Sequence, residues 1–259
     1  MGAVRPAGSR AGRRALTLHG RWRVERRNGT PAVLHRLSAG APREGRLVRV
    51  CRPLSAALVL GSAQRESDAD LDNCREARVP VVRRRSGGGA VLVAPGAQLW
   101  VDVFVPRGDE LFVQDVSASF LWLGEAWAEA IDGVAPPTGP GGASGEVDGI
   151  GRACVHRGAP VVSELSARLC FLGAVPGEVF VAGRKVVGCS QRRDRDGAWF
   201  HTMALLEQEP ARLTALMSFP PAEREEATRL LDAAEGIVRG GRGVVGPLEA
   251  ALLEALAHR

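Results

Sequence analysis

One lysine stands out among the cations of this chain. Lys185, in GRKVVGCSQRR (residues 183–193), is the only lysine in 259 residues, although lysine and arginine together number 34. A lysine carries a compact charge, and burial can shift its pKa, whereas the broad guanidinium of arginine stays charged. The neighbours Val186, Val187 and Cys189 predict a buried strand. Lys185 is therefore a candidate for catalysis. Chance survival in an arginine-rich composition and a surface position with a buried stem are the alternatives.

A second candidate is RRRSGGGAVLV, residues 83–93. Three consecutive glycines after a strand allow close approach of a ligand, and their N–H groups can hold a carbonyl or a phosphate. The phosphate-loop pattern GxxxxGK[ST] and the pattern GxGxxG are both absent. A tight bend would also explain the glycines. The arginines just before them favour an anion.

The third candidate is Cys170, in the apolar segment RLCFLG (residues 168–173), which we expect to be a strand. A lone cysteine there is most often a small buried hydrophobe. That interpretation holds more strongly for Cys51, Cys74, Cys154 and Cys189. The five cysteines form neither a CxxC pair nor a disulfide framework, which favours a reducing cytosol. The body histidines, His156 and His201, lack metal-site spacing, so we predict no metal.

Patterning around these candidates predicts an α+β fold with mostly antiparallel sheet. Short apolar runs predict strands at 47–53, 57–62, 80–85, 90–93 and 99–105, the last two joined as a hairpin around Pro95-Gly96, and several more between 152 and 206. The segments AGRK and RDRDG supply turns among the later strands. Helices are expected at 68–78, at 109–131 with Trp122 and Trp127 as packing residues, and at 222–238 and 247–259. Residues 133–149 are rich in Gly and Pro and predict a loop or flap.

Composition limits the class of protein. The formal charge of +5 is spread along the chain and does not argue for nucleic acid, and no apolar run is long enough for a membrane span. No secretory signal is evident, so we expect a cytoplasmic protein. We expect a disordered basic tail at 1–18, a catalytic domain at 19–206 and a helical extension at 207–259.

Two ordered motifs resemble a known family. Arg83-Arg84 and Ser86 to Val91, followed by Gly183 to Gln191 and then by His201 in a strand, resemble the lipoate–protein ligase A/B superfamily. The upstream LGSAQ, with Gln64, is similar to the family's G-x-x-Q strand. The resemblance covers residues 45 to 206. It implies mixed, mostly antiparallel sheets flanked by helices, as in the catalytic domain of biotin and lipoate protein ligases.

The resemblance also implies roles for individual residues. Lys185 would lie against the carboxyl end of a lipoyl or octanoyl chain and stabilise the acyl oxygen as it gains charge. The residues implied in substrate binding are Gln64, Arg84, Ser86, Gly87, Gly88, Gly89, Ala90, Gly183, Gly188 and His201. The loop from Ser86 to Gly89 would line the entrance of the acyl chain.

Two reactions fit such a fold. A ligase makes an acyl-adenylate from ATP, with Mg²⁺, and then acylates a lysine of a carrier domain. A transferase, which needs no cofactor, takes the acyl group from an acyl carrier protein thioester through a cysteine. Cys170-Phe171 lies fifteen residues before Lys185, and this arrangement is similar to the M-type octanoyltransferases. The acceptor would be a lipoyl-carrier domain or a glycine-cleavage H-type protein.

Departures from the family pattern bear on that choice. Val93 and Ala94 stand where His and Asp are usual, and Ala97 stands at the Asn position. These replacements count against nucleotide and Mg²⁺ handling, so a Cys170 transferase is the favoured interpretation. An ATP-dependent lipoate ligase and a non-catalytic protein that binds an acyl group or its carrier remain the alternatives.

Overall fold

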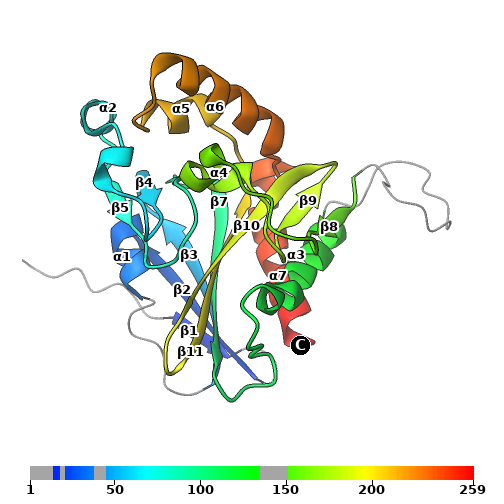
Figure 1. Cartoon of the computed structure of the whole chain (residues 1–259). Coiled ribbons are helices and arrows are strands. Elements are labelled where there is room, and N and C mark those ends of the chain that lie inside the picture. The colour runs from blue at the N-terminus through cyan, green and yellow to red at the C-terminus, as the bar shows by residue number, and fades with distance from the viewer. Residues whose placement is uncertain (1–13, 18–20, 38–44, 135–150) are drawn as a thin grey trace, which may run out of the picture.

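Two β-sheets form the body of the protein (Figure 1). The computed structural model describes residues 14–17, 21–37, 45–134 and 151–259. The large sheet has the order β1-β2-β3-β7-β11-β10-β9-β8, and the small one has the order β5-β4-β6. The strands are β1 (Arg14–Thr17), β2 (Trp22–Gly29), β3 (Arg46–Pro53), β4 (Ala57–Leu60), β5 (Val81–Arg83), β6 (Val91–Val93), β7 (Gln98–Pro106), β8 (Ala153–Val155), β9 (Val179–Val181), β10 (Arg184–Arg193) and β11 (Gly197–Leu205).

Most strand pairs are antiparallel, as the sequence predicts. The pairs β2–β3 and β4–β5 are parallel. The helices are α1 (Pro31–Arg36), α2 (Leu71–Glu76), α3 (Leu121–Val134), α4 (Glu164–Arg168), α5 (Pro210–Ala215), α6 (Pro221–Ala234) and α7 (Val245–Ala257). Short 3₁₀ turns lie at η2 (Glu66–Asp68), η3 (Ala118–Phe120), η4 (Cys170–Leu172) and η5 (Gly241–Val244).

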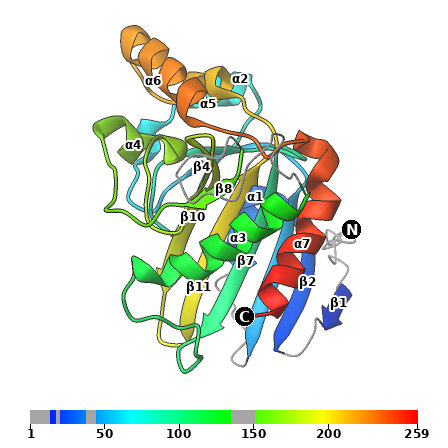
Figure 2. The same cartoon turned by 90° about the vertical axis from the view of Figure 1, so that its right-hand side faces the viewer.

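Helices α3 and α7 cover one face of the large sheet (Figure 2). The other face carries a second core, shared with the small sheet and with helices α1, α5 and α6. Strand β11 shows how one sequence serves both faces, because successive side chains point to opposite sides. Phe200 and Ala204 pack with the helices, whereas Met203 and Leu205 join the second core. His201 shares that second face.

Trp127 anchors α3 on the sheet. Its ring is fully buried, and its indole N–H donates to the hydroxyl of Thr202 on β11 at 3.0 Å. Satisfying that donor is what allows a tryptophan to be buried here. Truncating such a residue to alanine costs about 3–5 kcal/mol. The prediction that Trp127 is a packing residue is confirmed.

The expected hairpin around Pro95-Gly96 is wrong. Strand β6 pairs with β4 in the small sheet, whereas β7 pairs with β3 and β11 in the large sheet. Gln98 holds the crossing between the two sheets: its side chain accepts from Ala94 N at 3.2 Å and donates to Leu92 O at 2.7 Å. Gly96, at φ +74°, supplies the bend.

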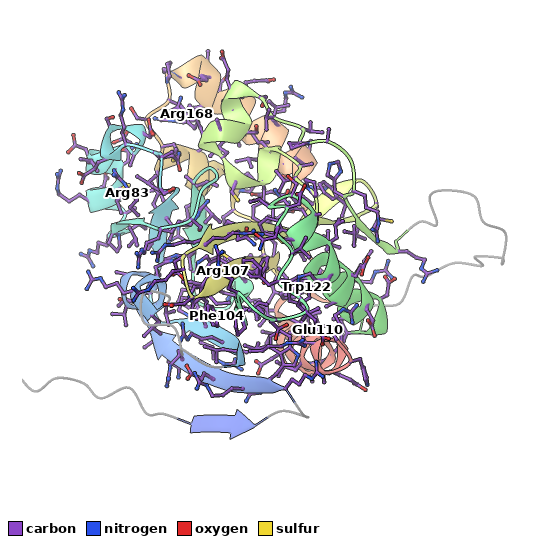
Figure 3. All side chains as sticks on the ribbon, turned by 60° about the horizontal axis from the view of Figure 1, so that its bottom comes forward. Arg83, Phe104, Arg107, Glu110, Trp122 and Arg168 are labelled. Atoms are coloured by element: carbon purple, nitrogen blue, oxygen red, sulfur yellow. The ribbon has the colours of Figure 1, made fainter. Side chains whose placement is uncertain are left out.

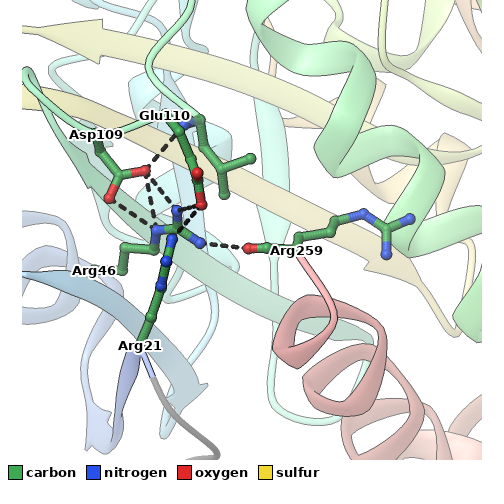
Figure 4. Close-up of polar contacts among 6 residues, drawn as sticks. Arg21, Arg46, Asp109, Glu110 and Arg259 are labelled. Carbon is green, nitrogen blue, oxygen red and sulfur yellow. Dashed lines mark hydrogen bonds and ion pairs between the residues drawn. The ribbon is translucent and has the colours of Figure 1, made fainter.

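The helix expected from residue 109 begins later, at Ala118–Phe120 and Leu121. The Asp109 carboxylate accepts from Leu111 N at 2.9 Å, a local bond that competes with a helical turn. It also binds Arg46, which is 3% exposed. Figure 4 shows Arg46 between Asp109, Glu110 and the carbonyl of Arg259. This network connects the loop before α3 to the first residue of β3 and to the residues that follow α7.

The two turns predicted between the late strands are confirmed. Ala182 and Gly183, at φ +51° and +74°, close the β9–β10 hairpin. Asp194 N bonds to Gly197 O at 3.0 Å and closes the β10–β11 hairpin. Gly197 is required there, because a Cβ would lie 2.2 Å from Val105 O.

The segment RLCFLG is not a strand. Arg168 ends α4, and Cys170 opens the 3₁₀ turn η4. Only one bridge of strand type remains, between Leu169 and Ala90. The Arg168 guanidinium donates to Glu223 on α6 at 3.0 Å and lies 3.8 Å over the ring of Phe219. Figure 3 labels Arg168 among the side chains. These contacts favour the end of a helix over a strand.

The amino-terminal prediction needs one correction. Residues Arg14–Thr17, expected to belong to a disordered tail, form strand β1, which pairs antiparallel with β2. Residues 1–13 and 18 of the expected tail, and positions 135–149 of the expected flap at 133–149, lie outside the described residues. The helices expected near the carboxyl end are confirmed as α6 and α7, while the domain boundaries stay predictions. None of the described helices could cross a membrane.

Candidate active site

A small cavity of about 30 Å³ brings several of the candidate residues together. It lies between strands β10 and β11, the segment that connects β5 to β6, and the 3₁₀ turn η4. Its walls are formed by His35, Arg84, Val91, Cys170, Phe171, Gly188, Cys189, Ser190, His201 and Met203. A volume of this size holds only a water molecule or two.

The register of β10 and β11 decides which side chains reach the cavity. Gly188 pairs with Met203, and Ser190 pairs with His201, so these four residues share one face of the sheet. A Cβ at Gly188 would lie 3.1 Å from the ring of Phe171. Any side chain at this position would therefore displace Phe171 or fill the cavity.

The glycine-rich segment allows close packing of backbones. A Cβ at Gly61 would lie 1.8 Å from the carbonyl oxygen of Gly88, and one at Gly89 would lie 2.5 Å from Leu169 N. Gly88 also has φ +92°. Gly87 has no neighbouring atom within 4 Å of a built Cβ and faces open space. The tight-bend interpretation therefore accounts for Gly88 and Gly89, and the substrate-binding role of this segment stays a prediction.

Neighbouring residues of this segment join it to the rest of the site. The hydroxyls of Ser86 and Ser190 lie 2.9 Å apart, which links the segment to β10. Ala90 N donates to Arg168 O at 2.8 Å, and Cys170 N donates to Ala90 O at 3.0 Å. Cys170 is thus positioned by the residue that follows the three glycines.

Arg84 is buried beneath the glycine-rich segment, with 5% of its surface exposed. Its guanidinium donates to Gly87 O at 2.7 Å and to Gly89 O at 2.8 Å, and to Val59 O at 3.5 Å. Burial lowers the pKa of Arg84, and the adjacent Cys170 thiol acts in the opposite direction. An arginine remains a cation after such a shift.

Lys185 is also buried, as predicted, with 2% of its surface exposed. All three of its N–H donors have partners: Cys170 O at 2.8 Å, Gly173 O at 3.0 Å and the Glu178 carboxylate at 2.7 Å. Its Nζ also lies 5.1 Å from the centre of the Phe171 ring. Lys185 does not line the cavity directly. It holds the backbone of the turn that carries Cys170.

Glu178 is the carboxylate that neutralises Lys185. Its side chain also accepts from Val175 N at 3.0 Å and from Cys189 N at 3.2 Å. Burial raises the pKa of Glu178 above its ordinary value, although Lys185 and the two N–H donors oppose that shift. Sequence reasoning missed this residue. The signal was a carboxylate immediately before the apolar strand β9.

His201 has a second buried carboxylate as its partner. Its Nδ1 lies 2.8 Å from Asp102 Oδ1, and the indole of Trp100 donates to the same oxygen at 2.6 Å. Burial alone would raise the pKa of Asp102, but His201 and Trp100 bring it below its ordinary value. Because Asp102 fixes Nδ1 as the donor, Nε2 is the nitrogen left for the cavity. Asp102 was missed, and its signal was an acid inside the apolar strand LWVDVFV.

His35 contributes a second imidazole to the cavity wall. Its ring centre lies 4.4 Å from that of Trp100 and 6.3 Å from that of His201. Burial lowers the pKa of His35 to about 3, so its ring is neutral at ordinary pH. No motif or periodicity in the sequence pointed to His35.

The remaining predicted site residues lie around the cavity. Gln64 accepts from Gly61 N at 2.8 Å and donates to Arg168 O at 3.1 Å, so it links the end of β4 to the end of α4. Gly183 lies in the β9–β10 turn and lines a separate open groove of about 460 Å³. Ala90 is buried. The structure therefore brings Arg84, Cys170, Gly188 and His201 to one cavity and keeps Gly183 apart from it.

The other cysteines divide into two groups. Cys51, Cys74 and Cys189 are buried, as expected, whereas Cys154 is exposed and the prediction of a buried residue there is wrong. Strand β8 lies at the edge of the large sheet, which leaves the Cys154 side uncovered. Burial raises the pKa of Cys189 well above its ordinary value. Cys189 is thus kept as a neutral thiol beside the more accessible Cys170.

Three positions after the glycines carry no polar side chain. Val93, Ala94 and Ala97 are all buried, with 0%, 6% and 3% of their surfaces exposed. None of the three can ligate a metal ion or bond a phosphate through its side chain. The residues present at this point do not fit a magnesium nucleotide.

Comparison with known proteins decides the family. The model of the lipoyl protein ligase A/B catalytic domain matches residues 33–234, which is most of the chain. The chain belongs to this family. The match begins in α1 and ends with α6, so it includes the small sheet, the large sheet from β3 onward and every residue that lines the cavity.

Individual relatives agree with this assignment. The octanoyltransferase LipM of Clostridioides difficile (strain 630) is 25% identical over 173 residues, which cover 66% of this chain and 58% of that protein. A bi-partite lipoate protein ligase of Thermoplasma acidophilum, solved in a study with its E2 lipoyl domain, has a TM-score of 0.66 at 15% identity. The alignment covers 93% of this chain and 84% of that one.

A lipoate-protein ligase A bound with ATP has a TM-score of 0.61 at 16% identity, over 93% of this chain and 85% of that one. These likenesses confirm the fold class predicted from the sequence. At such low identity they show the fold alone. The choice between transfer and ligation must come from the residues of the cavity.

Proposed function

We propose that this protein transfers an octanoyl or lipoyl group from a donor thioester to a lysine of a lipoyl-carrier domain, through an acyl-enzyme on Cys170. The observation that carries the proposal is the cavity that Cys170 shares with His201, which is held by a buried aspartate. A thiol, a base and a group that orients the base are the parts that nucleophilic acyl transfer needs. The curated relative LipM, which bears the name octanoyltransferase, supports the same chemistry.

The first half-reaction uses the cavity as it stands. His201 Nε2 takes the proton of the Cys170 thiol, and the thiolate attacks the carbonyl carbon of the donor thioester. The bond from that carbon to the donor sulfur breaks, and the donor leaves as a thiol with the proton from His201. Asp102 favours this step because its charge stabilises the imidazolium that forms transiently.

The second half-reaction forms the amide. The amine of the carrier lysine attacks the acyl carbon, His201 takes the proton that the amine loses, and the Cys170 thiolate leaves and is reprotonated. Lys185 keeps its predicted role at the acyl oxygen as part of this proposal. Its Nζ would first have to release one of its three present partners.

The donor and acceptor follow from the reaction. An acyl carrier protein would supply the octanoyl thioester, and a lipoyl-carrier domain or a glycine-cleavage H-type protein would supply the lysine. An octanoyl chain is larger than a cavity of about 30 Å³, so Phe171 and Met203 must turn aside when it binds. The proposed steps need neither ATP nor Mg²⁺, and the apolar side chains of Val93, Ala94 and Ala97 offer no ligand for either.

The test is to mix the pure protein with octanoyl-acyl carrier protein, without ATP, and to measure the intact mass. We expect one octanoyl adduct, which is lost in Cys170→Ser. Cys154→Ser is the matched control, since it removes an exposed cysteine outside the cavity, and it should keep the adduct. Adding a carrier domain should move the octanoyl group to the carrier.

Other outcomes would overturn the proposal in distinct ways. Acylation of the carrier that needs octanoate and ATP, and survives Cys170→Ser, would make the protein a lipoate ligase. Binding of the carrier without turnover under either donor would make it a non-catalytic binding protein. An adduct that moves to another cysteine would reassign the nucleophile.

A further inference from the structure

The two cations buried near Cys170 differ in how their charges are balanced. Lys185 lies 2.7 Å from the carboxylate of Glu178, and both side chains are almost completely buried. Arg84 forms no ion pair with a carboxylate in the part of the chain that the structure describes. Its acceptors are the carbonyl oxygens of Gly87, Gly89 and Val59, which are neutral.

A buried charge without a counter-charge is costly, and carbonyl dipoles balance it only in part. Arg84 therefore creates a place where an anion is stabilised. Lys185 creates no such place, because Glu178 cancels its charge at close range. A thiolate that forms at the cavity should therefore be stabilised mainly by Arg84.

Cys170 is the group beside Arg84 that can become an anion. Both residues line the same cavity. The guanidinium bonds Gly89 O, and the next residue, Ala90, receives the N–H of Cys170 at 3.0 Å. The backbone of one short segment thus fixes the guanidinium and the cysteine relative to each other.

We propose that Arg84, and not Lys185, is the cation that stabilises the thiolate of Cys170, while the Lys185–Glu178 pair fixes the backbone of Cys170. The inference rests on the proposed function, in which the thiolate forms twice. It is the nucleophile in the first half-reaction and the leaving group in the second. Arg84 lowers the free energy of the thiolate at both points, and the proton meanwhile resides on His201 Nε2.

Other charged and titratable groups around the cavity do not replace Arg84. His35 is neutral, Asp102 is an anion bonded to His201, and Cys189 is a neutral thiol. Arg49, which is also buried, lies near Asp102 and Glu25. The titratable groups that line the cavity with Cys170 are His35, Arg84, Cys189 and His201. Behind them, Lys185 bonds to Cys170 O, and the carboxylates of Glu178 and Asp102 pair with Lys185 and His201.

The experiment measures how fast iodoacetamide alkylates Cys170 at each pH, in a Cys154→Ser background, with the modified peptide quantified by mass spectrometry. The midpoint pH of this alkylation in the background is the reference value. Arg84→Gln should raise the midpoint by about one unit or more, which corresponds to a tenfold or greater loss of thiolate. Arg84→Lys, which keeps the charge, should recover part of the loss.

Two further variants complete the design. Lys185→Met combined with Glu178→Gln removes the neutral pair as a unit, and the midpoint should stay within a few tenths of a unit. Arg83→Gln removes the same charge from the neighbouring exposed position and should also leave the midpoint in place. If Arg84→Gln fails to fold, the Arg84→Lys and paired variants still decide the question.

The inference is overturned if Arg84→Gln leaves the midpoint of the background unchanged. A rise in the paired variant would assign the stabilising charge to Lys185 instead. Alkylation requires no acyl donor, so this result is independent of the adduct experiment. A midpoint raised by Arg84→Gln without an octanoyl adduct would retain Arg84 as the partner of the thiolate and reject the transferase.

Discussion

The ammonium of Lys185 and the carboxylate of Glu178 form an ion pair of 2.7 Å with both side chains about 2–3% exposed. The lysine donates its two remaining hydrogen bonds to carbonyls of the turn that carries Cys170. The glutamate accepts hydrogen bonds from two backbone N–H groups. Three separate pieces of chain therefore meet at one pair of charges. The pair therefore stabilises the fold and is also a candidate part of the site.

Breaking the pair from one side should destabilise the protein strongly. Glu178→Gln leaves the ammonium buried without a counter-charge, and we expect a loss of about 3–5 kcal/mol in the free energy of unfolding. Urea unfolding followed by tryptophan fluorescence would measure it. The double variant with Lys185→Met should recover most of the loss. A single variant as stable as the wild type would mean that water reaches the pair.

Replacing Lys185 by arginine tests whether the position needs a lysine. The planar fork of arginine cannot aim three N–H groups at the carbonyls of Cys170 and Gly173 and at Glu178, and it adds volume to a packed place. We expect a loss of about 1–3 kcal/mol in stability and a slower octanoyl adduct. Arg184→Lys, on the same strand, is the matched control. Wild-type adduct formation in Lys185→Arg would refute the requirement.

Asp102→Asn should weaken His201 as a base while leaving the packing around it unchanged. The amide can still accept from Nδ1, but it cannot stabilise an imidazolium by charge. The rate of adduct formation should fall by roughly 10²–10⁴-fold, and its dependence on pH should change shape. Stopped reactions followed by intact mass at several pH values would show both. Asp196→Asn, in the exposed β10–β11 turn, should behave as the wild type, and an equal fall there would point to a general effect.

Gly188→Val should fill the space that an acyl chain needs. Its side chain would meet the ring of Phe171 at the cavity wall. We expect octanoyl transfer to slow by roughly tenfold or more, while transfer from an acetyl donor changes less. Gly133→Ala, where no atom lies within 4 Å of a built Cβ, is the control for adding a methyl group. Equal slowing of both donors by Gly188→Val would place the chain elsewhere.

Glu235 gives a prediction for stability against pH. Burial raises its pKa to about 7 in the folded protein. Between its ordinary value of 4.5 and 7 the folded state therefore binds the proton more tightly than the unfolded state, so this group lowers stability as pH rises through that window. Glu235→Gln should gain up to about 3 kcal/mol over the wild type at pH 8 and nearly nothing at pH 4. A gain that does not depend on pH would contradict the burial argument.

Much of the fold was predictable from period and turn chemistry. Short apolar runs identified β3, β7 and β11, and the Ala182-Gly183 and Asp194 to Gly197 turns followed from their residue types. Pro95-Gly96 misled because a turn signal does not say whether the next strand stays in the same sheet. RLCFLG misled because an apolar run also suits a turn buried between two layers.

The site was predictable only in part. Lys185 stood out as the only lysine and Cys170 as a lone cysteine in an apolar segment, while the resemblance to the lipoate–protein ligase family added Arg84 and His201. Their carboxylate partners, Glu178 and Asp102, came to light only in three dimensions, since an ion pair between distant segments leaves no local pattern. Arg84 could be linked to an anion from sequence, but the absence of a carboxylate beside it is a property of packing.

Arg168 gives the site a mechanical dependence on helix α6. Its carbonyl accepts from Ala90 N and from Gln64, and its guanidinium bonds to Glu223 on α6 and lies over Phe219. Cys170 follows it by two residues, in a turn that itself packs against α6. A load applied to α6, by a docked protein or by the force of an unfolding experiment, therefore reaches the nucleophile directly, and reactivity should fail before the sheets separate.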